Sequence, residues 1–196
     1  MGSRPNYTDA GRKMKLAIAA ATAAGLLAGC AMMGGGGPSA KATLQATKGN
    51  SAAGTVTFTQ RGDKVQVVAN ITGLKPGQEH GFHIHDKGDC SSGDGMSAAG
   101  HFNPLAKPHA HPSTPNRHAG DLPALKADSN GNASLSVELD VITVAGGPPD
   151  AYGTVADQPT SIIGRGLIVH AQPDDYKTQP TGNAGARIAC AVIQKN

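Results

Sequence analysis

The chain has 196 residues, enough for one domain with a substantial core or for two small ones. Aromatic residues make up only 3% of the sequence and Trp is absent, whereas Gly occurs 27 times and Pro 13 times, which argues against a helical bundle and favours short elements joined by turns. The formal net charge of +3 arises at the N-terminus, because the chain beyond position 29 has 13 basic and 13 acidic residues; this balance excludes a composition-based case for nucleic-acid binding.

Residues 1–29 have the pattern of an export signal. The basic segment "GRKMK" precedes the apolar run "LAIAAATAAGLLAG", Leu16–Gly29, which has the length of a signal-peptide core and is too short to cross a bilayer comfortably as a helix. Met14, directly before Lys15, is an alternative translation start. We therefore expect an exported protein.

The apolar run ends in "LAGC", Leu27–Cys30, which resembles a bacterial lipobox. This resemblance implies that Cys30 receives lipid and becomes the first residue of the mature protein. It also implies a membrane-anchored lipoprotein of the cell envelope that faces the periplasm or the outside. An ordinary cleaved signal whose junction carries a cysteine is the alternative.

The three cysteines are Cys30, Cys90 and Cys190. If Cys30 carries lipid, the other two can pair in an exported domain without a leftover thiol, although two free buried thiols remain the alternative. A bridge between them would close a loop of about 100 residues and stabilise the fold by at most roughly 4–5 kcal/mol.

Short alternating runs dominate the chain after the flexible, Gly-rich tether of residues 31–40. Turn residues, as in "KPGQ" and "ADSNGN", separate these runs. The spacing predicts an all-β domain over residues 41–196, a Greek-key antiparallel β-sandwich or flattened barrel. The expected strands are "ATLQAT", "GTVTFTQ", "KVQVVANITGL", "HGFHIH", "ASLSVELDVITV", "GLIVHAQ" and "ARIACAVI".

Two segments do not fit the short-loop pattern. The first lies between His85 and the strand expected near Ala133, and it holds four histidines and Cys90. The second, Gln172–Gly185, lies between His170 and the last strand. Long irregular segments in compact domains are usually functional or disordered, and the metal-capable side chains favour function.

None of the eight histidines lies in the first 79 residues, and seven of them fall between positions 80 and 118. In "GFHIHDKGDC", an extended strand would place His83 and His85 on the same face. In "RHAGDLP", a tight turn could bring His118 and Asp121 onto one ion. Imidazole ligands without thiolates suit copper and zinc, and an added carboxylate is compatible with zinc.

Five motifs occur in the order found in the copper/zinc superoxide dismutases: "GFHIHDKGDC", "GHFNPLAKPH", "RHAGDL", "GRGLIVHA" and "TGNAGARIAC". The resemblance covers nearly all of residues 41–196. It implies copper bound by His83, His85, His101 and His170, and zinc bound by His101, His109, His118 and Asp121. His101 would bridge the two ions. The spacing within the family favours His109 over His111, and leaves His80 and His111 as surface histidines.

The resemblance assigns further roles. Asp174 would link the copper ligand His83 with the zinc ligand His109. Arg187 would attract and dock the anionic substrate beside copper, with Lys177 as a doubtful further contributor. Cys90 and Cys190 would form the disulfide that ties the long loop to the barrel.

The implied reaction is 2 O₂⁻ + 2 H⁺ → O₂ + H₂O₂, catalysed by Arg187, His101 and a copper that alternates between two oxidation states, with zinc in a structural role. Superoxide is the expected partner, together with the membrane, and either a monomer or a homodimer is compatible with the sequence. A metal-buffering module of the same fold is the first alternative, but such a module would lack a ligand or the arginine. A zinc hydrolase is the second, and it would need an open zinc position.

Overall fold

The computed structural model describes residues 1–2, 37–145 and 159–196. The predicted signal segment beyond Gly2, the predicted lipidation site Cys30 and most of the tether lie outside the described residues. One compact unit, Gly35–Asn196, holds the strands described below. Within the described part of the chain, no helix has both the length and the apolar character needed to cross a membrane.

The described residues form ten strands and one short helical turn. The helical turn is the 3-10 helix η1, Met96–Ala98. The longer strands are β1 Ser39–Ala46, β2 Ala53–Arg61, β3 Lys64–Thr72, β5 Phe82–His85, β7 Ala133–Leu139, β8 Gly166–His170 and β9 Arg187–Val192. The two-residue strands are β4 Glu79–His80, β6 Leu125–Lys126 and β10 Gln194–Lys195.

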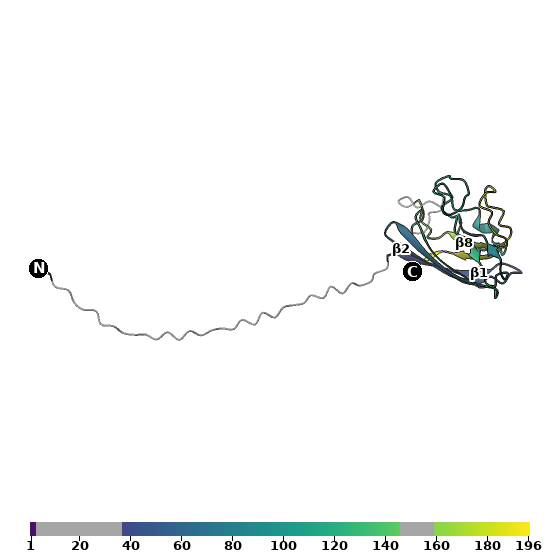
Figure 1. The fold of residues 1–196 in the computed structure, drawn as a ribbon, viewed down its shortest axis with the longest axis horizontal. Coiled ribbons are helices and arrows are strands. Elements are labelled where there is room, and N and C mark those ends of the chain that lie inside the picture. Colours follow the sequence, from purple (N-terminus) through teal and green to yellow (C-terminus); the bar gives the residue numbers. More distant parts are fainter. Residues whose placement is uncertain (3–36, 146–158) are drawn as a thin grey trace. The chain divides into compact units, whose positions relative to one another are not determined.

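The strands curl around a common interior in the order β5-β8-β9-β1-β2-β3-β7, with every neighbouring pair antiparallel (Figure 1). Strand β10 pairs with β1, and β4 pairs with β6 in a separate small sheet. Three neighbouring pairs, β3 with β7, β5 with β8 and β1 with β9, are not consecutive in the chain. Such crossovers are typical of Greek-key folds, and the predicted all-β class is confirmed.

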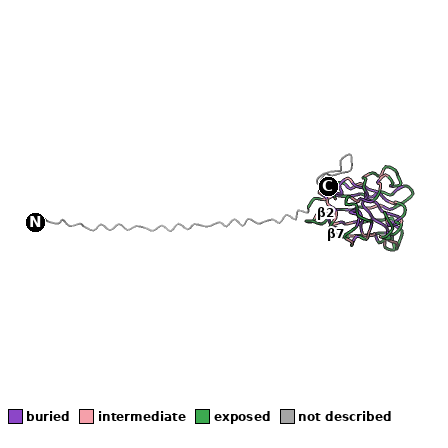
Figure 2. Tube along the Cα trace, turned by 90° about the horizontal axis from the view of Figure 1, so that it is seen from above, coloured by how far each residue is buried: buried purple, intermediate pink, exposed green. Residues whose placement is uncertain are grey.

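The core follows the alternation that predicted the strands. In β3 the side chains of Val65, Val67, Ala69 and Ile71 are buried, and the residues between them are more exposed. Figure 2 shows the buried residues gathered between the strands and the exposed ones at the periphery. Successive side chains of a strand point to opposite faces, so one face of β3 packs into the interior and the other meets solvent.

The strand predicted over residues 133–144 ends earlier, at Leu139. At the next residue, the Asp140 carboxylate accepts a hydrogen bond of 2.8 Å from the buried Arg117 guanidinium. The N–H of Val144 donates to the side chain of Gln60 instead of to a strand. Residues 141–144 thus lie outside β7: Ile142 and Val144 are buried in the core, and Thr143 forms an isolated parallel bridge with Ser161.

A disulfide and a closely packed glycine hold the two long loops against the strands that carry the histidines. Cys90 and Cys190 form a disulfide, as predicted, which joins the first loop, residues 86–132, to β9. Gly81 separates β4 from β5, and a Cβ there would lie 2.7 Å from the Cβ of Ala184. The second loop, residues 171–186, therefore packs directly against the start of β5.

Candidate metal centre

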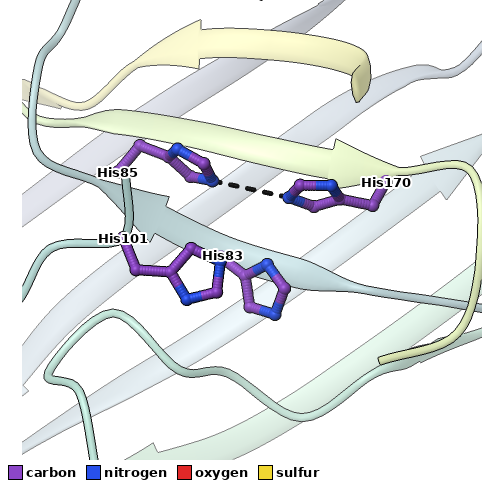
Figure 3. A group of neighbouring side chains, drawn as sticks. All are labelled: His83, His85, His101 and His170. Carbon is purple, nitrogen blue, oxygen red and sulfur yellow. Dashed lines mark hydrogen bonds between the residues drawn. The ribbon is translucent and has the colours of Figure 1, made fainter. Parts of the chain in front are cut away.

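Four histidines from two strands and one loop point toward one another in the interior (Figure 3). His83 and His85 lie on β5, His170 ends the adjacent strand β8, and His101 comes from the first loop. An isolated bridge pairs His101 with His85, so the loop is held against the strand. All four side chains are buried, and one ligand atom of each lies within 4.8 Å of the others.

The protons on His85 and His170 can be assigned from their neighbours. The Nδ1 atom of His85 lies 2.9 Å from the carbonyl oxygen of Ala99, and that of His170 lies 3.2 Å from the carbonyl oxygen of Gly185. A carbonyl only accepts, so each Nδ1 carries the proton and each Nε2 carries a lone pair. The two Nε2 atoms are 3.4 Å apart, and two lone pairs at that distance suit a shared cation.

The other two histidines add lone pairs from the opposite side. His83 donates through Nε2 to Asp174 Oδ2 at 2.7 Å, which leaves its Nδ1 without a proton. That Nδ1 and the Nε2 of His101 are both buried and have no hydrogen-bond partner among the described residues. Buried polar nitrogens are normally satisfied, and a metal ion bound by these four atoms would satisfy them. The donor set fits copper, which binds imidazole nitrogens well.

A second group shares His101 with the first. The Nδ1 atoms of His101 and His109 lie 3.0 and 2.9 Å from Asp121 Oδ1, and the Nδ1 of His118 lies 3.4 Å from the same oxygen. All four residues are buried, and their ligand atoms lie within 4.8 Å of one another. Three imidazoles and one carboxylate make a closed four-ligand set of the kind that holds structural zinc.

Asp121 is held in place by the backbone of the same loop. Its Oδ2 accepts hydrogen bonds from the N–H groups of Ala110 at 3.1 Å and His118 at 3.0 Å. This leaves Oδ1 for the three histidines. Burial alone would raise the pKa of Asp121, but the hydrogen bonds with the histidines hold this pKa far below its usual range. The carboxylate is therefore ionised, as a metal ligand must be.

Burial and mutual repulsion set the protonation of the rings of the first group. Burial, together with the neighbouring His83, lowers the pKa of His101 to about 4 and that of His170 to about 3. The pKa of His85 is also lowered well below its ordinary value, first by burial and then by His101 and His170. At neutral pH these rings are uncharged and present lone pairs.

Asp174 connects the two groups through the second loop. Its two carboxylate oxygens contact the Nε2 of His83 at 2.7 Å and the Nε2 of His109 at 2.9 Å. Gly182, with φ at +67°, lies directly beside this carboxylate, and a Cβ there would collide with it. Carboxylates in this position fix the orientation of the ligating rings.

Arg187 stands at the start of β9 beside the first group. Its guanidinium donates to the carbonyl oxygens of Gly95 at 2.7 Å and Ala99 at 2.6 Å. The Ala99 carbonyl also contacts His85, so one backbone group orients both side chains. The half-buried positive charge of Arg187 contributes to lowering the pKa of His85 and of His170, as expected of a cation close to both rings.

The remaining candidate residues lie outside both groups. His111 and Lys177 are exposed, and the ring of His111 contacts the hydroxyl of Ser113 at 2.8 Å and the ring of Tyr176. The prediction that His80 is a surface residue was wrong. His80 is 1% exposed, and its Nδ1 lies 2.8 Å from the carbonyl oxygen of His170, a member of the first group. The neighbouring Gly81 lets His170 at the end of β8 and Ala184 of the second loop approach closely, since a Cβ there would lie 3.3 and 2.7 Å from their Cβ atoms.

Some contributors gave no signal in the sequence. The carbonyl groups of Ala99 and Gly185 orient His85 and His170, and any residue type could supply them. The side chain of Gln179 contacts the backbone of His109, although the two residues are 70 positions apart. Only the fold brings these groups to the site.

A family comparison now decides the class of the protein. The sequence model of the copper/zinc superoxide dismutases matches residues 52–193. The chain belongs to this family. It is therefore an oxidoreductase that uses copper and zinc, and the two histidine groups are the places where this structure can hold them.

Two relatives extend the comparison. The chain is 41% identical over 146 residues to the Cu-Zn superoxide dismutase of Paramecium bursaria Chlorella virus 1, covering 71% of each protein. It is also 41% identical to the clock protein EA4, whose crystal structure superposes with a TM-score of 0.68 over 80% of this chain and 93% of that one.

Proposed function

We propose that this superoxide dismutase holds copper with His83, His85, His101 and His170, and zinc with His101, His109, His118 and Asp121. In this arrangement His101 bridges the ions through its two ring nitrogens. The supporting observation is that the two nitrogens of this ring belong to different groups. Its Nδ1 lies 3.0 Å from Asp121, and its Nε2, buried beside the other three histidines, has no hydrogen-bond partner in the described part of the chain. The family match supplies the metals and the reaction.

Bound copper supplies the redox chemistry, because it can take an electron from one superoxide and return it to another, which zinc cannot do. Arg187 attracts the anion to the first group, and the closed second group holds His101 in position. With no metal on its Nε2, His101 would hold a proton at that atom and supply it to the peroxide product. Asp174 keeps the rings of His83 and His109 oriented throughout.

Metal buffering without turnover is the alternative function for the same fold. The simultaneous presence of all the candidate ligands and of Arg187 beside His85 favours turnover, because a buffer needs no anion-attracting charge. Metal analysis together with a superoxide-consumption assay tests this. We expect about one copper and one zinc per chain and rapid superoxide consumption; zinc alone after copper loading would contradict the enzymatic assignment.

We further propose that the enzyme is a lipoprotein that protects the cell envelope from superoxide. The support is the sequence "LAGC" after an apolar run, together with a disulfide, which persists in exported proteins. Cys30→Ser should release the protein from the membrane fraction without changing its activity. Continued membrane association of this variant would refute the lipid anchor.

A further inference from the structure

The side chain of Gln179 forms two hydrogen bonds with the backbone of His109. The N–H of His109 donates to Gln179 Oε1 at 2.8 Å, and Gln179 Nε2 donates to the carbonyl oxygen of His109 at 2.7 Å. Only one orientation of the amide satisfies both contacts, since the oxygen must accept and the nitrogen must donate. One side chain thus replaces the pair of bonds that a neighbouring strand would provide.

His109 needs such a partner because of where it lies. Between β5 and β6 the first loop contains the short helix η1 and isolated bridges at His101 and Asp121 but no strand, so no ladder holds the backbone of His109. The sequence around it, "LAKPHAHPSTP", is rich in Pro, which cannot donate a backbone hydrogen bond. The ring of His109 nevertheless has to stay 2.9 Å from Asp121 for the second group to remain closed.

The second loop holds His109 at both its ring and its backbone. Asp174 contacts the ring at Nε2, and Gln179, five residues later, contacts the backbone. The hydroxyl of Tyr176, between them in the chain, accepts a hydrogen bond from the N–H of Ala124 in the first loop at 3.0 Å. The contact of Gln179 is therefore part of an ordered junction between the two loops.

We propose that Gln179 is a positioning residue that fixes the backbone of His109 and so slows the release of zinc. This inference rests on the proposed assignment of His109 as a zinc ligand. Residues that orient metal ligands typically change metal affinity by 10- to 100-fold when they are replaced. Gln179 contacts neither group of ligand atoms, so its effect should appear in zinc retention and in the geometry of the zinc site.

Two substitutions separate the hydrogen bonds. Gln179→Met keeps the length of the side chain and removes both bonds, whereas Gln179→Glu keeps the acceptor for the His109 N–H and loses the donor to its carbonyl group. Gln60→Met is the matched control, because the amide of Gln60 also bonds to backbone groups, those of Gly62, Lys64 and Val144, away from both metal groups.

The measurement is the rate of zinc transfer from the loaded full-length protein to a chelating dye, with the visible spectrum of cobalt(II) in the zinc site as a second readout. We expect Gln179→Met to release zinc about 10- to 100-fold faster than the unmodified protein and to shift the cobalt bands. The rate of zinc release from Gln179→Glu should lie between those of Gln179→Met and the unmodified protein. The rate from Gln60→Met should stay within about twofold of that of the unmodified protein.

The outcomes distinguish the two proposals. Unchanged zinc release and an unchanged cobalt spectrum in Gln179→Met would overturn the role of Gln179, and so would equal acceleration in Gln60→Met. His109→Ala tests the underlying assignment: if that variant retains zinc normally, the ligand set is wrong. If Gln179→Met does not fold, Gln179→Glu provides the same test, with faster release expected and unchanged release contradicting the role.

Discussion

His85 and His170 face each other across neighbouring strands with their Nε2 atoms 3.4 Å apart, and each ring is oriented by a backbone carbonyl bonded to its Nδ1. In the register of β5 against β8, His85 pairs with Gly166 and His83 with Ile168, so alternation along β8 puts His170 on the same face of the sheet as both histidines. The proposed copper site is thus built on two rigid strands, with the loop residue His101 added to it.

Replacing His85 with Ala should remove copper selectively. Because His85 belongs to the first group only, zinc content should stay near one per chain while copper binding weakens. Replacing a residue that only orients a metal ligand typically lowers metal affinity or activity by 10- to 100-fold, so loss of a direct ligand should lower activity by at least about 100-fold. Metal analysis and a superoxide assay measure both effects. His111→Ala, an exposed histidine outside both groups, is the control and should behave as the unmodified protein; normal copper content in His85→Ala would contradict the ligand assignment.

Reversing the charge of Arg187 should slow the reaction of the anionic substrate. Electrostatic steering changes the association rates of charged substrates by roughly 10- to 1,000-fold. We therefore expect Arg187→Glu to lower the rate of superoxide consumption at low salt by about tenfold or more. Rising ionic strength should narrow the difference because salt screens the field. Arg61→Glu changes the net charge equally at an exposed position on β2 and should have little effect. Equal rates for Arg187→Glu and the unmodified protein would exclude a steering role.

Zinc binding to the metal-free protein should release a proton from His109 at neutral pH. Both ring nitrogens of His109 face carboxylate oxygens at 2.9 Å, which can only accept hydrogen bonds. Burial alone would lower the pKa of His109, but the bonds to Asp121 and Asp174 raise it to about 9. Titration calorimetry in buffers of different ionisation enthalpy should detect the release of this proton on zinc binding at pH 7.5. The release should disappear above pH 9, where His109 is already neutral before zinc binds. Identical proton release at pH 7.5 and 10 would refute the prediction.

The stability of the metal-free protein should be greatest near neutral pH. The raised pKa of His109 stabilises the fold below about 6.5, and this contribution is lost as the pH rises through about 9. The lowered pKa values of His101 and His170 act oppositely: their contribution is present above about 6.5 and is lost as the pH falls through about 4 and about 3. The melting temperature of the metal-free protein at pH 4.5, 7 and 10 measures this dependence. A melting temperature that only rises or only falls with pH would contradict the prediction.

Removing the disulfide should destabilise the domain. The bridge joins residues 100 positions apart, for which the chain-entropy model gives roughly 4–5 kcal/mol as an upper figure. In a domain of this size the melting temperature should fall by about 10 °C in Cys90→Ser. Because the bridge ties the first loop to β9, where Arg187 lies, activity should fall more steeply with temperature than it does in the unmodified protein. A melting temperature within 2 °C of the unmodified protein would show that the bridge contributes little.

The sequence by itself determined the all-β class, because alternating burial is a local property of each strand. It also identified the candidate ligands, through the spacing of His83 and His85 on one strand and through motifs that resemble a single family. The same alternation overestimated the strand after Ala133, since a core-facing apolar residue such as Val144 looks alike in and out of a ladder.

Only the tertiary structure decided how the ligating atoms are oriented. The lone pairs of His85 and His170 depend on the carbonyl groups of Ala99 and Gly185, which are independent of side-chain identity. The burial of His80 and the contact of Gln179 with His109 also depend on segments that are distant in the chain. A single sequence records which residues are available, whereas long-range contacts set which nitrogen of each ring is free to bind a metal.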